Sequence, residues 1–176
     1  MSTLTVKELS HPAGEVLKIS AGKVLDLKSQ GTVTMPTGSL LQTVQTGAFS
    51  RLTITSTGSW VSTGNTLAIT PSSTSSKVLI SITQPIAVAG STPMRGGLRL
   101  SRNGVVVWNT DGFTEHIQVR NADNEHHAVV TIVHLDSPSS SSAVTYTLQA
   151  YLLTGTHFYA FESGKGATMV LQEIQG

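Results

Sequence analysis

Histidine is the residue type in this chain best suited to ligating a metal ion, and three of its six histidines lie close together. His126 and His127 follow Glu125, and His134 comes later in the same predicted strand. Successive side chains of a strand point to opposite faces, so His126 and His134 share a face while His127 points away. Eight residues of strand span about 26 Å, too far for one ion with ligands at about 2.1 Å. The spacing favours solvated or interface histidines, and an ion could be held only between strands or subunits.

Other polar segments have the composition of a site but not its spacing. Asn121–Glu125 is rich in oxygen atoms but lacks the spaced ligands and fixed glycine of a calcium loop, which favours a polar hairpin loop. Ser163–Gly166 contains glycine and lysine, but it is shorter than a phosphate-binding loop and precedes a strand, so we expect a turn. The chain contains no Gly-x-Ser-x-Gly nucleophile motif and no carboxylate pair placed by spacing. We therefore expect a protein that is not an enzyme, with no catalytic residue, metal or cofactor.

Aromatic residues could stack on sugar rings or fill a core, and they make up only 5% of the chain. Filling a sandwich core and a subunit axis is the favoured interpretation. If Phe158–Phe161 is a strand, however, it must place rings on both faces, so at least one ring should meet solvent, a subunit or a ligand. The aromatic residues concerned are Trp60, Trp108, Tyr151, Phe158, Tyr159 and Phe161.

The charge balance and the termini exclude several classes of partner. Eleven Lys and Arg against ten Asp and Glu give a net charge of +1 without a block of like charge, so nucleic-acid binding has no support. The chain has no cysteine, which excludes disulfides and thiolate zinc sites. Its N-terminus lacks the features of a signal peptide, and its most apolar long stretch, Val78–Gly90, is too short to span a bilayer. We expect a protein that is soluble when synthesised, with neither nucleic acid nor membrane as a partner.

From Ser39 onward the chain has the pattern of successive short strands. Asn103–Gly104 separates two apolar runs, Leu98–Arg102 and Val105–Trp108, and both turn residues accept the positive φ of a type I′ hairpin. Gln84–Pro85 should divide Lys77–Ala89 into two strands, because proline cannot donate to a ladder. The fold class predicted is all-β: an antiparallel β-sandwich or jelly roll, preceded by an extended arm of short β turns. The other predicted strands are Leu40–Val44, Leu52–Thr55, Leu67–Thr70, His127–Leu135, Ala143–Leu153, His157–Phe161 and Ala167–Ile174.

The later strands are apolar on both faces. In Ala167–Ile174, Met169, Leu171 and Glu173 share one face, while Val170 and Ile174 lie on the other. A sandwich covers one face of each sheet. A subunit interface is the simplest cover for the other face.

The arm, residues 1–37, contains a tandem octad. Ala13–Ser20 and Ala21–Lys28 repeat the same pattern of Ala, Gly, charge, Val, Leu, charge and an apolar residue. Each copy predicts a turn and a strand too short to bury its own apolar face, so the arm must be completed by neighbours. We therefore divide the chain into a docking arm, residues 1–37, and a head, residues 38–176. The apolar residues expected to make the arm's contacts are Leu4, Val6, Val16, Leu17, Ile19, Val24, Leu25 and Leu27.

The head resembles a family of virion structural proteins of tailed bacteriophages, found in viruses of cyanobacteria and other aquatic bacteria. The order of several phrases carries the resemblance, which covers residues 38–176 and identifies no catalytic residue. A Thr-Leu-x-Val segment, here Thr3–Val6, usually precedes such heads. The matching phrases are Gly38–Gln45, Ile69–Ile80, Leu98–Arg102, Leu135–Pro138, Thr145–Gln149 and Met169–Ile174.

This resemblance implies a trimeric jelly-roll head. The leading expectation is a homotrimeric capsid cement or decoration protein, made in the host cytoplasm and placed on the capsid exterior, whose arm grips the major capsid protein. The alternative is the receptor-binding tip of a tail fibre, attached to the fibre shaft or baseplate. Exposed loops would then touch host surface glycans, at positions near Asn121, Asp123, Ser139, Ser140 and Gly164.

Replacing an apolar octad residue by a charged one should test whether the arm is needed for assembly but not for folding of the head. Leu17→Asp or Leu25→Asp is expected to weaken assembly, because a carboxylate replaces a buried contact, while the head stays folded. Circular dichroism and virion incorporation would measure the two effects. Unchanged trimer formation and incorporation in both variants would contradict the arm as the attachment element.

Overall fold

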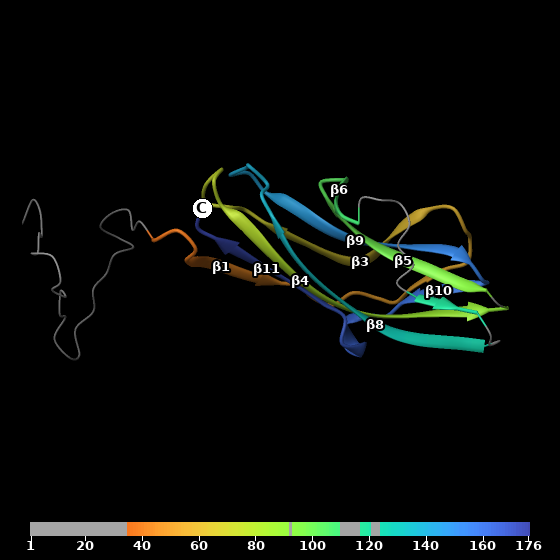
Figure 1. Cartoon of the computed structure of the whole chain (residues 1–176). Coiled ribbons are helices and arrows are strands. Elements are labelled where there is room, and N and C mark those ends of the chain that lie inside the picture. Colours follow the sequence, from red (N-terminus) through yellow and green to blue (C-terminus); the bar gives the residue numbers. More distant parts are fainter. Residues whose placement is uncertain (1–34, 92, 110–116, 121–123) are drawn as a thin grey trace, which may run out of the picture. The chain divides into compact units, whose positions relative to one another are not determined.

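A computed structural model describes residues 35–91, 93–109, 117–120 and 124–176. The chain divides into two units, Met1–Met35 and Pro36–Gly176, and all but Met35 of the first unit lies outside the described residues. The second unit, here called the head, consists of strands in two antiparallel sheets (Figure 1). The prediction of an antiparallel β-sandwich is therefore confirmed. The arm of residues 1–37 stays a prediction.

The first sheet is built around one long strand, β4 (Lys77–Gly90). Along one edge β4 pairs over almost its whole length with β8 (Asn124–Asp136). Along its other edge it pairs first with β11 (Thr168–Ile174) and then with β10 (His157–Ala160). The outer strands are β1 (Leu40–Gln45) on β11 and β2 (Leu52–Ile54) on β10.

The second sheet has β9 (Val144–Thr154) between β3 (Trp60–Ile69) and β5 (Met94–Arg102). On the far side of β5 lie β6 (Val105–Trp108) and β7 (Ile117–Val119), of which β7 was not predicted. The predicted hairpin of β5 and β6 is confirmed. Its turn residues Asn103 and Gly104 have φ of 47° and 84°, as a type I′ turn requires.

Alternation along the strands places one apolar set of each sheet between the layers. In β11 the predicted shared face is confirmed, and the structure shows that it is the inner one, since Met169, Leu171 and Glu173 are all buried. In β9 the even-numbered residues face inward, and Tyr146 is among the largest fully buried side chains. The core contains, among others, Val78, Ile80, Ile82, Ile86, Leu98, Leu100, Ile132, Leu148, Leu152 and Phe158.

The prediction of two short strands around Pro85 is wrong, because β4 continues through this proline. Paired residues of an antiparallel ladder normally exchange two hydrogen bonds, of which proline can make only the accepting one. The Phe161 N–H donates to the Pro85 carbonyl at 3.0 Å. The buried Gln84 side-chain amide then donates to the Phe161 carbonyl at 2.9 Å, in place of the missing proline N–H. The strand therefore stays continuous at little cost in unpaired backbone.

The β3 strand also differs from expectation. The sequence predicts a short strand at Leu67–Thr70, but the structure has one longer strand that starts at Trp60 and has a register shift between Ser62 and Thr66. Gly64, with φ of 82°, lies in this irregular segment, where a side chain would be strained. Asn65, also in it, is buried and donates to the Gln84 side-chain oxygen at 3.3 Å. Asn65, in the irregular segment of β3, thus holds the Gln84 side chain that compensates for Pro85 in the other sheet.

Gly96 should be the glycine least tolerant of substitution in the core. A Cβ built there would lie 2.1 Å from the Phe158 ring, which belongs to the opposite sheet. Gly96→Ala is expected to lower the free energy of unfolding by about 1–3 kcal/mol, because the two sheets cannot separate without opening the core. Urea denaturation would measure the change. Gly47→Ala, where a Cβ meets nothing within 4 Å, is the matched control, and equal effects in both variants would contradict this packing.

Candidate interaction surface

The outward face of β8 carries an exposed row of apolar side chains. Val129, Val133 and Leu135 are 65%, 66% and 51% exposed, and Thr131 between them is exposed too. We call these four residues the β8 stripe. They alternate with inward-facing residues such as the buried Ile132, as the strand period of two requires. Among the described strands only β4 pairs with β8, so this stripe lies on an edge strand.

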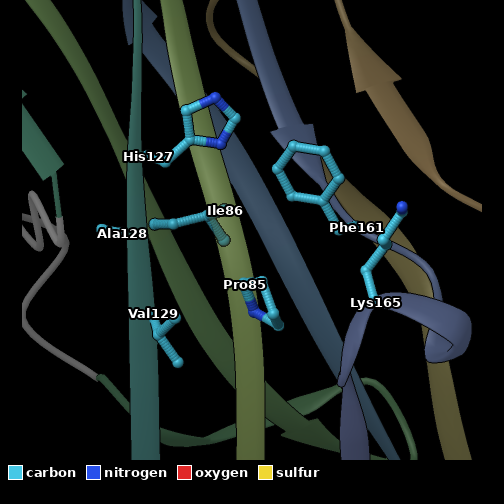
Figure 2. A pocket seen from close by; sticks show the side chains of 7 residues that line it. All are labelled: Pro85, Ile86, His127, Ala128, Val129, Phe161 and Lys165. Atoms are coloured by element: carbon cyan, nitrogen blue, oxygen red, sulfur yellow. The ribbon is translucent and has the colours of Figure 1, made fainter.

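A hollow of about 630 Å³ adjoins the stripe on the same face of the sheet (Figure 2). It forms where the partner of β4 changes, since β11 pairs as far as Thr83 and β10 begins at Ile86. Between these two strands the chain leaves the sheet through η1 (Ser163–Lys165), a 3-10 turn. Figure 2 shows Phe161 and Lys165 on one side of β4 and the β8 residues on the other. The lining residues are Pro85, Ile86, His127, Ala128, Val129, Phe161 and Lys165.

A row of rings crosses the outer face beside this hollow. His127 stacks on Phe161 with centroids 5.6 Å apart, and Tyr159 lies 6.3 Å from Phe161. His157 stacks on Tyr159 at 5.7 Å, and the Arg51 guanidinium lies 5.4 Å above the Tyr159 ring. The row joins β8, β10 and the residue after β10. It places half-exposed aromatic surface next to the apolar stripe.

A second aromatic cluster belongs to the other sheet. Trp60 on β3 and Tyr151 on β9 have centroids 5.1 Å apart, and the Arg99 guanidinium lies 4.5 Å above the Trp60 ring. Gln149 accepts a hydrogen bond from Arg99 Nε at 2.7 Å. Partial burial lowers the pKa of Arg99. A planar ring with a cation and an amide beside it can stack on and hydrogen-bond a flat polar ligand.

The expectation that the aromatic residues fill the core is confirmed for Phe158, and the half-buried Trp108 also packs against the core. Their expected place at a subunit axis stays a prediction. Phe158 is buried, whereas Tyr159 and Phe161 are half-buried on the outer face, and the other three are also half-buried. Strand parity is the reason, because Phe158 and Ala160 face the core and Tyr159 therefore cannot. The prediction that Phe158–Phe161 puts rings on both faces is confirmed.

The histidines follow the predicted parity. His126 and His134 lie half-buried on the inward side of β8, and His127 is exposed on the outward side, 3.2 Å from Glu125. Among the described residues no group of three His, Cys, Asp or Glu side chains gathers as a metal site would need.

The predicted loop contacts that the structure describes lie in two separate loops. Ser139 is exposed and Ser140 half-buried, in the loop that follows β8, where Asp136 pairs with Val78. Gly164 is exposed in η1, which lies beside the middle of β4. Asn121 and Asp123 are outside the described residues. So are all eight arm residues, which are Leu4, Val6, Val16, Leu17, Ile19, Val24, Leu25 and Leu27.

Two buried carboxylates, which the sequence did not reveal as structural, each accept several hydrogen bonds. Glu173 is 1% exposed and accepts bonds from the Ser72 N–H and hydroxyl and the Ser76 hydroxyl at 2.7 Å each. Its other oxygen accepts from Gln42 Nε2 at 2.6 Å. Burial opposes ionisation of Glu173, but the bonds from Ser72, Gln42 and Ser76 outweigh it and lower its pKa. This carboxylate fastens β1 and the loop before β4 to the last strand.

Asp136 ties the two sheets together. It lies on β8 and accepts from Arg102 on β5 at 2.5 Å and from the Tyr146 hydroxyl on β9 at 2.7 Å. Burial and the hydrogen bond to Asp136 raise the pKa of Tyr146, so the phenol stays protonated and remains a donor. Sequence alternation could have placed Asp136 on the inner face, because it shares parity with Ile132. Its partners, however, come from another sheet.

Comparison with known proteins gives no assignment: no protein-family model matches the chain, and no curated protein sequence matches it. The described part contains no helix with the length and apolar character that crossing a membrane requires.

Acid should weaken the fold through Glu173. The pKa of Glu173 in the folded state lies below the ordinary value of 4.5, so its ionised form contributes fully to the free energy of unfolding above pH 4.5. The contribution is lost as the pH falls through the folded value. Glu173→Gln is expected to lower the free energy of unfolding by about 2 kcal/mol at pH 7, because the amide group cannot accept all four bonds.

Urea denaturation at pH 7 and at pH values below 4.5 would measure this dependence. The difference between wild type and Glu173→Gln should shrink in acid. A difference that stays constant from pH 7 into acid would contradict the role of the ionised carboxylate.

Proposed function

We propose that this protein is a structural protein of a tailed-phage virion, a homotrimeric decoration protein that binds and stabilises the capsid shell from outside. The observation that carries the proposal is the exposed apolar face of β8, where three large apolar side chains are at least half exposed. Exposed apolar surface of this kind is suited to binding other protein chains. The sequence resemblance to trimeric virion heads gives the class of assembly.

The polar groups support a structural role rather than catalysis. Asp136 and Glu173 use their oxygens to hold strands together, and Glu125 lies beside the exposed His127. Glycoside hydrolysis would need two carboxyl groups about 5–10 Å apart across a cleft. Among the described residues, none that lines the hollow beside β8 is a carboxylate. The proposed function therefore includes no reaction and no cofactor.

The arm is the proposed attachment element. Its two octads each combine apolar and charged residues in a strand too short to bury its own apolar side chains, so they suit a surface that supplies cover. In this proposal the arm binds the major capsid protein while the head stands outside. Trimers also fit the local threefold positions of an icosahedral shell.

A receptor-binding tip of a tail fibre is the second candidate. The cluster of Trp60, Tyr151 and Arg99 on the second sheet favours it, because an aromatic ring beside a cation and an amide can hold a sugar ring. In this case the partner would be the fibre shaft or baseplate, and the ligand a host surface glycan. The two candidates differ in where the protein lies on the particle.

The number of copies per virion tests the leading proposal. Quantitative mass spectrometry of purified virions is expected to find hundreds of copies, because a decoration protein repeats with the shell lattice. The major capsid protein in the same sample provides the internal standard. A few copies per particle would exclude the decoration role.

Antibody labelling of intact particles separates the two candidates. A shell-wide label supports decoration, and a label confined to the tail supports the fibre tip. An antibody against the head should be used, so that the attached arm does not have to be accessible.

A further inference from the structure

We infer that copies of this protein contact one another through the β8 stripe together with the hollow at Pro85 and Phe161. This inference rests on the proposed homotrimer and names the surface that would form it. The stripe and the hollow share Val129, so they form one continuous surface on the outer face of the first sheet.

The β8 strand lacks several of the devices that keep edge strands from pairing, although it carries an inward-facing charge, Asp136, at one end. Natural edges are protected by lysine, proline, bulges or short length. Asn124–Asp136 is 13 residues long and contains neither lysine nor proline. Its register with β4 is unbroken from Val78↔Asp136 to Gly90↔Asn124, so no bulge turns the edge away. Among the described strands, none occupies its outer edge.

A second copy is the occupant that fits, because one chain supplies both complementary shapes. Val133 and Leu135 project from the surface, and the hollow beside Pro85 can receive apolar side chains. A contact between different patches of identical chains builds a closed ring, such as a trimer, when the rotation between copies closes. The charges do not oppose it, since the net charge of the whole chain is only +1 and the stripe itself is uncharged.

A polar small molecule fits this surface less well. A saccharide needs several hydroxyl, amide or carboxylate partners. The hollow is lined by apolar side chains apart from His127 and Lys165. Lys165 belongs to η1 and is exposed, and it can remain in solvent while the apolar floor is covered.

A charge on the stripe should break the contact between copies. Val133→Lys is expected to convert the wild-type oligomer to monomer, with the dissociation constant raised at least about tenfold, because an ammonium group would lose its water. Size-exclusion chromatography with light scattering over a concentration series would measure this change in the full chain. Val129→Lys, at the border of stripe and hollow, should act in the same way.

Val105→Lys is the matched control, because Val105 is 64% exposed on β6 of the other sheet and undergoes the same chemical change. It should leave the oligomer intact. Thermal melting followed by circular dichroism should show all three variants folded, since each substituted side chain is exposed.

The outcomes separate this inference from the proposed function. A wild-type trimer that Val133→Lys and Val129→Lys both leave intact overturns the surface assigned here but not the trimer. A different wild-type oligomer that these variants dissociate supports the surface and overturns the trimer. A wild-type monomer at all concentrations overturns both.

Discussion

The head depends on the continuity of β4, the strand that pairs along both edges in the first sheet. Pro85 interrupts its hydrogen bonding at the point where one neighbour, β11, is replaced by another, β10. The buried amide of Gln84 supplies the bond that the proline cannot donate, and Asn65 from the opposite sheet supports that amide. An unpaired buried carbonyl would cost about 1–3 kcal/mol. Because the Gln84 amide supplies the missing bond, β4 stays one continuous strand and pairs with β8, β10 and β11. The same change of neighbour opens the hollow on the outer face.

The two sheets are further joined by carboxylates that would be costly to bury alone. Asp136 on β8 receives hydrogen bonds from Arg102 and Tyr146 of the other sheet. Glu173 binds the loop that carries the chain from β3 to β4. Each carboxylate is compensated by several donors, which is the condition for an acid to lie between apolar layers. The chain therefore uses two of its few acids for packing, which agrees with a structural role.

The outer face of the first sheet is formed by outward-facing residues of three strands, β8, β4 and β10. The residues of β8, β4 and β10 that do not face the core present Val133, Pro85 and Tyr159 on the outside. Such a face would normally carry charged or polar residues in a sheet exposed to water. An assembly protein has a physical reason to keep it apolar, since the apolar area gains about 25 cal/mol per Å² when another chain covers it. The proposed trimer and the β8 contact give this face a partner.

The sequence by itself determined the features that depend on neighbours along the chain. Alternation predicted that Met169, Leu171 and Glu173 share one face of β11, and Asn103–Gly104 predicted the β5–β6 hairpin, because turn conformation and strand parity are local properties. It could not determine that β4 passes through Pro85, since the compensating donor acts on Phe161, far along the chain. Only the tertiary structure decided which of two apolar faces is covered, because burial depends on segments that are distant in sequence and packed against the strand.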